Sequence, residues 1–275
     1  RDRLRSRGLG DVYKRQFLTD KGLTEWNQVT ETDLTAYIMQ IQREGCAQTT
    51  ISRYIVSIKA FFEYLYKNEI ISDEAAVNLK APRLDKKIPG VISVEDVVRL
   101  LTAPDGDTPK LLRDKAMLEL LYATGIKVSE LVSIRMEDVN LQMGYINCET
   151  MAHDRIIPFG KEAKQALIRY LKDGRDKLVK DNYSEYLFTN VNGGQMSRQG
   201  FWKLIKAYAK KAGIEEDITP YTLRHSFAAH MISNGADIYA VSEMLGHTDI
   251  SATQVYAVFS NSRLRDVYTK AHPRG

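Results

Sequence analysis

Residues 80–90 divide the chain into two blocks that we expect to fold separately. The segment holds two prolines, one glycine and four basic residues, and its apolar side chains follow no helical or strand period. Proline removes a backbone donor and disfavours the helical conformation in the residue before it, so helices usually end at such a segment. We predict an interdomain linker at residues 81–90, between a domain at residues 17–80 and another at residues 91–275.

The block before the linker has the pattern of two amphipathic helices. Thr30 and Asp33 mark a helix start, because a threonine can cap the first turn and an acid favours it. The second helix starts near Thr49, and Arg53 and Lys59 lie mostly off its apolar face. Both helices carry apolar residues at helical spacing, namely Leu34, Tyr37, Ile38 and Ile41 in the first and Ile51, Tyr54, Ile55, Ile58, Phe61, Phe62 and Leu65 in the second.

The block after the linker mixes helices with a short β-hairpin. Residues 145–148 and 155–158 have the composition of two short strands around a turn. We therefore predict a fold that is mainly α with a small β-sheet, an N-terminal helical domain followed by a C-terminal mixed α/β domain. The helices predicted in this block cover residues 93–101, 108–123, 161–180, 197–212, 220–234, 237–245, 250–258 and 261–270.

Residues 1–16 show neither helical nor strand periodicity and contain a dense basic run. One interpretation is a disordered basic arm, which would suit a nucleic-acid-binding protein. The interpretation we favour is an artefact, because residues 11–16 match the translation of a transposase adaptor used in sequencing libraries. On that view the natural sequence begins near Phe17 and has lost its upstream residues.

Composition narrows the class of protein. The net charge of +4 and the pI near 8.8 permit nucleic-acid binding without requiring it. No apolar run reaches the roughly 18–20 residues of a membrane span, so we expect no membrane partner. Cys46 and Cys148 match no metal spacing, and we interpret them as free thiols in the reducing cytoplasm.

An arginine, a histidine and a tyrosine gather near the C-terminus. Arg224 lies in the segment Tyr221-Thr222-Leu223-Arg224-His225, and Tyr256 follows His247 by nine positions. Guanidinium groups match the charge that develops on the oxygens of a reacting phosphodiester. A histidine can donate a hydrogen bond or carry a proton, and a tyrosine hydroxyl can attack and later be displaced.

These segments resemble the tyrosine recombinases of the phage integrase family, Xer-type site-specific recombinases in particular. The resemblance extends from Thr24 to Gly275. It implies an N-terminal DNA core-binding domain, a C-terminal catalytic domain with a tail helix that docks on a neighbouring subunit, and no metal or cofactor. The motifs that carry it are residues 121–131, 188–190, 197–199, 219–230, 245–256 and 260–270.

The resemblance also implies roles for single residues. Tyr256 would be the nucleophile that forms a 3′-phosphotyrosyl link. Arg224 and His247 would hold the phosphate, and Glu130 would brace the site. His225 and His230, in contrast, are expected to be structural residues.

Three positions depart from the pattern of the family. Lys127 stands where the family has an arginine, which loses the two-pronged donor. Tyr221 stands where histidine or lysine is usual, and a phenol is a poor base near neutral pH. The turn at residues 149–154 lacks the usual general-acid lysine, and His153 is either a substitute for it or a surface residue.

The expected partner is double-stranded DNA, bound by a homo-tetramer or by a hetero-tetramer with a related recombinase. Two functions remain open at this stage. The first is site-specific recombination by strand cleavage and rejoining. The alternative is a catalytically weakened member that mainly binds DNA or assists an active relative. Candidate phosphate contacts, each of which could also be a solvated surface charge, are Arg53, Lys59, Lys86, Lys87, Arg198 and Lys203.

Overall fold

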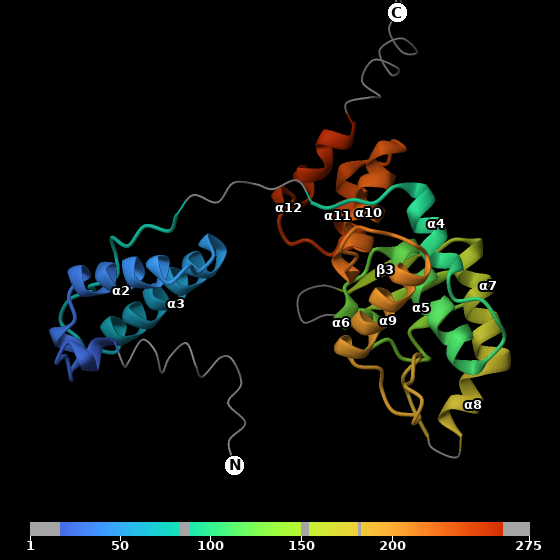
Figure 1. Ribbon diagram of the computed structural model, residues 1–275, viewed down its shortest axis with the longest axis horizontal. Helices are drawn as coiled ribbons and strands as arrows, with labels where there is room; N and C mark the ends of the chain where they lie inside the picture. Colours follow the sequence, from blue (N-terminus) through green and yellow to red (C-terminus); the bar gives the residue numbers. More distant parts are fainter. Residues whose placement is uncertain (1–16, 83–88, 150–153, 181–182, 261–275) are drawn as a thin grey trace, which may run out of the picture. The chain divides into compact units, whose positions relative to one another are not determined.

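The computed structural model describes residues 17–82, 89–149, 154–180 and 183–260 (Figure 1). Several predictions therefore lie outside the described residues: the artefact at 1–16, the roles of Lys86, Lys87 and His153, and the helix at 261–270. The chain divides into two compact units, residues 1–86 and 87–275. Each is considered by itself below.

In the first unit, the 3₁₀ turn η1 (Trp26–Gln28) leads into two packed helices, α2 (Glu31–Arg43) and α3 (Gln48–Lys67). The predicted helix start is confirmed, since the Thr30 hydroxyl accepts a hydrogen bond from the Asp33 amide at 3.3 Å. The core is formed by the predicted apolar faces, with one difference. Phe61 is 40% exposed, because its ring lies at the edge of the core, edge-on to Trp26.

The second unit is built around α5 (Pro109–Thr124), which is buried on most of its surface. Helix α4 (Val94–Thr102) packs on it, as do α7 (Lys161–Tyr170) and α10 (Pro220–Ser233). Its buried residues include the charged Arg113 and Asp114 as well as apolar side chains, so other elements must surround the helix on most sides. The remaining helical segments are α6 (Val128–Leu131), α8 (Asp176–Val179), α9 (Arg198–Lys211), α11 (Ile238–Leu245), α12 (Ser251–Gln254) and the 3₁₀ segment η3 (Val255–Ser260).

The predicted hairpin is confirmed, and it belongs to a three-stranded antiparallel sheet. Strand β2 (Tyr145–Cys148) pairs with β3 (Arg155–Pro158), and Ile146 faces Ile157 in the buried register. Strand β1 (Val139–Asn140) was not predicted, because two residues are too few to show an alternating pattern. The fold class, mainly α with a small sheet, is confirmed.

The helix predicted over residues 161–180 contains a π-helical turn, η2 (Leu171–Arg175). Gly174 lies in this turn against α5, and a Cβ there would come within 3.3 Å of the Leu112 Cβ. The glycine therefore lets the helix pass close to α5.

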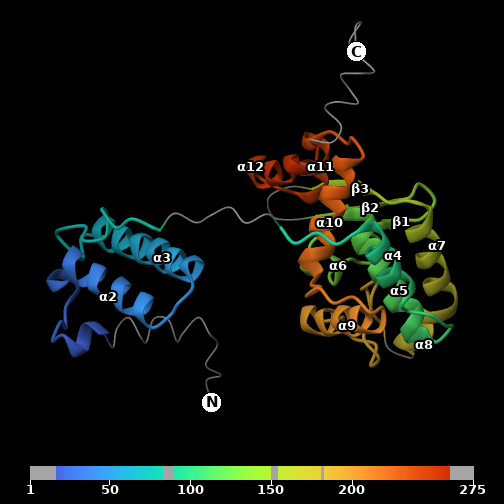
Figure 2. The same ribbon diagram turned by 45° about the horizontal axis from the view of Figure 1, so that its top comes forward.

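Strand β3 contacts α11, and η3 contacts α10 (Figure 2). These contacts bring the ends of several elements together at one place in the unit. Among the residues that the structure describes, no helix has the length and apolar character needed to cross a membrane.

Candidate active site

Arg224 lies at the centre of the candidate site. It is held on α10, whose start is fixed by Thr219 as N-cap and Pro220 as first residue. The Arg224 side chain is buried, and burial lowers its pKa, although a guanidinium remains charged near neutral pH. It donates hydrogen bonds of 2.6 Å to the carbonyls of Gly125, at the end of α5, and Leu245, at the end of α11.

These carbonyls belong to helix C-termini, which have no intrahelical donor and carry partial negative charge. One buried cation thus satisfies the ends of two helices. Gly125 caps α5 in the left-handed conformation, and a Cβ at this residue would lie 2.3 Å from a Phe227 ring carbon. Residue 125 must therefore be glycine for α10 to approach α5 this closely.

His247 directly follows the glycine that ends α11. Its Nε2 lies 3.2 Å from Arg224 Nη2, and its Nδ1 lies 2.8 Å from the Thr253 hydroxyl. Because arginine only donates, Nε2 must accept, so Nδ1 carries the proton and donates to Thr253. Burial, with the nearby charges of Arg224 and Lys127, lowers the pKa of His247 to about 4. The imidazole is therefore neutral at neutral pH.

Tyr256 lies on η3 and is only 2% exposed. Its hydroxyl forms a hydrogen bond with His225 Nδ1, from the residue after Arg224. Burial raises the pKa of Tyr256, and the charge of Arg224 partly opposes this rise. The hydroxyl therefore keeps its proton at neutral pH.

Glu130 links α6 to β3. Its carboxylate accepts hydrogen bonds from the Lys127 amide at 2.7 Å and from Arg155 Nη2 at 2.8 Å. The Lys127 ammonium lies 4.0 Å from the other Glu130 oxygen, on a side chain that is 47% exposed. Arg155 also donates to the Met244 carbonyl at 3.1 Å. The Glu130–Arg155 pair thus joins the first motif, the sheet and the end of α11.

Arg155 also packs against Gly246. A Cβ on Gly246 would lie 2.6 Å from Arg155 Nη1, and Gly246 has a left-handed φ of +64°. Residue 246 therefore needs glycine for two reasons, the backbone conformation and the space that Arg155 occupies. Both features fix the turn that presents His247.

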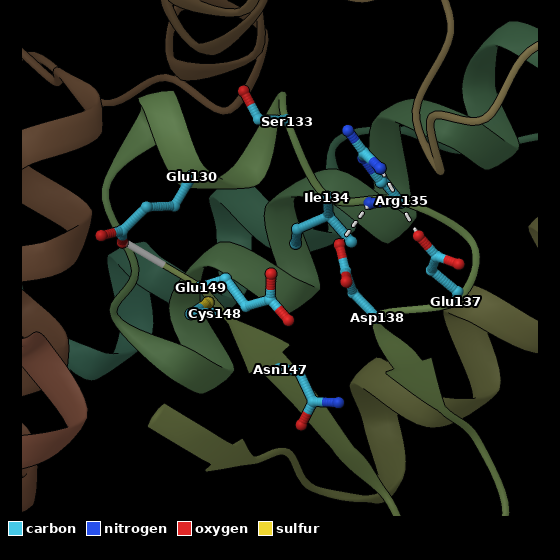
Figure 3. A pocket seen from close by; sticks show the side chains of 9 residues that line it. All are labelled: Glu130, Ser133, Ile134, Arg135, Glu137, Asp138, Asn147, Cys148 and Glu149. Carbon is cyan, nitrogen blue, oxygen red and sulfur yellow. Dashed lines mark hydrogen bonds and ion pairs between the residues drawn. The ribbon is translucent and has the colours of Figure 1, made fainter. Parts of the chain in front are cut away.

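Glu130 also lines an open pocket (Figure 3). Glu130 lies on one side of it, and Arg135, Glu137 and Asp138 lie together opposite. Glu149 also lines the pocket, which makes four carboxylates and one arginine among its lining residues. Such a surface repels a phosphate. An anion is therefore expected on the Arg224 and His247 side of Glu130.

The sequence-predicted residues divide into two groups. Arg224, His247 and Tyr256 meet around α10, with Glu130 and Lys127 close to them. Tyr221 is 69% exposed at the start of α10. On α3 and α9, Arg53, Arg198 and Lys203 are exposed and Lys59 is partly buried. These four remain predicted DNA contacts.

Two site residues were missed. His225 was assigned a structural role, and Arg155 was treated only as a strand residue. Neither lies in a pattern that marks a contact with Tyr256 or Glu130. One signal was available for Arg155, because a lone arginine in an otherwise apolar strand suggests a buried partner.

The second unit matches the phage integrase family over residues 91–263, and residues 13–69 match the N-terminal SAM-like domain of phage integrases. Tyrosine recombinase XerD of Listeria monocytogenes serotype 4b (strain F2365) is 44% identical, over 92% of this chain and 86% of its own length. XerD of Staphylococcus epidermidis (strain ATCC 35984) is 39% identical, over 96% and 92%.

Solved structures share the fold. A crystal structure of XerA recombinase matches all of this chain and 94% of its own, with 28% identity and a TM-score of 0.59. A structure of the Tn1549 transposon integrase in complex with transposon right end DNA matches 98% of this chain and 95% of its own, with 19% identity and a TM-score of 0.74.

We expect Gly246→Ala to destabilise the chain more than Gly213→Ala. Gly213 has a φ of +65° and nothing within 4 Å of an added Cβ, so its variant measures backbone strain alone, roughly 1–2 kcal/mol. Gly246→Ala adds the clash with Arg155, roughly 1–3 kcal/mol more. Thermal unfolding of both variants checks this expectation. Equal losses would show that Arg155 moves aside freely.

We also expect His247 to make the fold sensitive to acid. The pKa of His247 is about 4 in the folded chain and about 6.5 in the unfolded chain. Between pH 4 and pH 6.5 the unfolded chain therefore binds more protons than the folded chain. The resulting stability is present above pH 6.5 and is lost as the pH falls toward 4. Between pH 7 and pH 4.5, the melting temperature of His247→Gln should therefore fall less than that of the wild type. The same loss in both would contradict the assigned neutral state.

Proposed function

The chain belongs to the phage integrase family, the tyrosine recombinases, and we propose that it cuts and rejoins DNA strands at specific sites through Tyr256. The observation that carries the proposal is the meeting of Arg224, His247 and Tyr256 in one place. His247 Nε2 lies 3.2 Å from the Arg224 guanidinium. The Tyr256 hydroxyl forms a hydrogen bond with His225, which follows Arg224 on α10. A cation, an imidazole and a hydroxyl nucleophile together suit transfer of a phosphoryl group.

In the proposed reaction, the Tyr256 oxygen attacks the phosphorus and the 5′ oxygen of the broken strand leaves. The protein then holds the 3′ end as a phosphotyrosyl ester. A 5′ hydroxyl from another strand attacks this ester, restores a phosphodiester and releases Tyr256. Because one ester replaces another, little bond energy is lost and no nucleotide cofactor is needed.

Arg224 would bind the non-bridging phosphate oxygens. Its hydrogen bonds to Gly125, Leu245 and His247 use three of its five N–H groups. The other two, one on Nη1 and one on Nε, have no partner among the described residues and would bind the phosphate. Since the carbonyl contacts fix the guanidinium before DNA arrives, it need not reorganise as charge develops.

His247 would change its protonation when the phosphate enters. In the free site its Nε2 accepts from Arg224, and burial together with the surrounding cations holds its pKa low. A phosphate beside it adds negative charge, which favours the imidazolium. Nε2 can then donate to a phosphate oxygen.

DNA is the substrate of the proposed reaction, and we propose that the protein acts on it in the cytoplasm. Exposed Arg53 on α3, and Arg198 and Lys203 on α9, would contact the backbone of a duplex. Two sites must be brought together for strand exchange, so we propose a tetramer on DNA. The four subunits would be identical, or paired with a related recombinase.

Covalent trapping tests the proposal. A nicked duplex prevents religation, so the protein should remain attached to DNA on a denaturing gel. The duplex sequence can be selected from a random library by its binding to the protein. We expect the adduct with wild type and its complete loss with Tyr256→Phe. An adduct that survives in Tyr256→Phe would refute the assigned nucleophile.

Lys127→Arg tests the departure in the first motif. Arginine restores a two-pronged donor, so the rate of adduct formation should rise. The upper limit of the increase is roughly 100-fold, the effect of one well-placed donor on the rate. Lys67→Arg, on an exposed side chain of the other unit, serves as the matched control. No gain over this control would place Lys127 away from the phosphate.

A further inference from the structure

The Tyr256 hydroxyl has a histidine as its hydrogen-bond partner. In the part of the chain that the structure describes, His225 Nδ1 is the one group found bonded to this hydroxyl. The two ring centroids lie 5.8 Å apart, with 44° between the ring planes. The contact is shielded from water, since Tyr256 is 2% exposed and His225 is partly buried.

Among the described residues, charged and titratable groups approach His225 from three elements. Tyr256 faces it from η3, Arg224 precedes it on α10, and His247 approaches from the turn after α11. Burial and then the charge of Arg224 lower the pKa of His225, while burial raises the pKa of Tyr256. The resting pair is therefore a neutral phenol and a neutral imidazole. A neutral phenol has a proton to donate, and Nδ1 is placed to accept it.

Tyr221 cannot serve this purpose. Its side chain is 69% exposed at the start of α10, and a phenol is a poor base near neutral pH. His230, on the same helix, is bonded to a different tyrosine, with Nδ1 2.9 Å from the Tyr122 hydroxyl. His225 is thus the imidazole that contacts the proposed nucleophile.

We propose that His225 is the catalytic base of the strand-cleavage step, an assignment that rests on the proposed function. As the Tyr256 oxygen bonds to phosphorus, its O–H bond breaks and the proton passes to His225 Nδ1. The P–O5′ bond breaks with its electron pair on the 5′ oxygen, which takes a proton from solvent water. In rejoining, His225 returns its proton to the departing Tyr256 oxygen. The imidazolium formed in between is balanced by the negative charge of the phosphate.

His225→Asn tests the assignment, because asparagine places an oxygen near the position of Nδ1 and keeps a hydrogen-bond acceptor, but it cannot take a proton. We expect adduct formation on the nicked duplex at pH 7.5 to slow by about 100- to 10,000-fold, the usual worth of a general base. His230→Asn is the matched control, since it removes another histidine–tyrosine bond on α10, and it should react within about threefold of wild type. Native-gel binding and melting temperature should stay close to wild type in His225→Asn; if they fall, His225→Gln takes its place.

The pH profile distinguishes a base from a structural support. The wild-type rate should rise as His225 loses its proton and then level off, whereas the His225→Asn rate should keep rising as hydroxide takes over. A rate within about threefold of wild type, or a wild-type pH profile at a lower level, would overturn the assignment.

A duplex with sulfur in place of the bridging 5′ oxygen supplies a second test, because its leaving group needs no proton. The defect of His225→Asn should persist on this duplex. If sulfur restores the rate, His225 acts on the leaving group and the assignment is wrong. Failure of the proposed function would look different from failure of the His225 assignment. In that case the wild-type protein would form no adduct, or Tyr256→Phe would still form one.

Discussion

The buried guanidinium of Arg224 is the interaction on which the site depends. A cation is costly to bury unless hydrogen-bond acceptors compensate it. Here the acceptors are carbonyls at the ends of α5 and α11, groups that themselves lack intrahelical partners. The cation needs acceptors and the helix ends need donors. The position of Arg224 and the packing of the two helix ends therefore depend on each other. His247 and Tyr256 are then arranged around a charge that is already fixed.

Much of the fold was predictable because its determinants are local. Helical periodicity and the Thr30 cap located α2, and the strand-like composition on both sides of a turn located β2 and β3. Strand β1 was missed because it has only two residues. Phe61 was assigned to the core because it lies on the apolar face of α3, but only part of that face is buried. The π turn at 171–175 depends on contact with α5, which no local pattern reveals.

The site was predictable only where a motif marked it. Arg224, His247 and Tyr256 were found from their spacing, and the resemblance to tyrosine recombinases is confirmed by relatives 39–44% identical over most of the chain. Those relatives are named as recombinases, which does not favour the alternative of a binding protein. His225 and Arg155 were missed because their importance comes from partners 31 and 25 positions away. Sequence spacing does not reveal such contacts.

The packing of Arg155 against Gly246 has a consequence for how such sequences diverge. While the long side chain of Arg155 lies against the turn, residue 246 has no room for a Cβ. A lineage that first shortened residue 155 would gain that room, although it would leave Glu130 without its guanidinium partner. The opposite order passes through a clash beside His247. The cost of a side chain at residue 246 therefore depends on which residue stands at 155, so the order of the two substitutions matters.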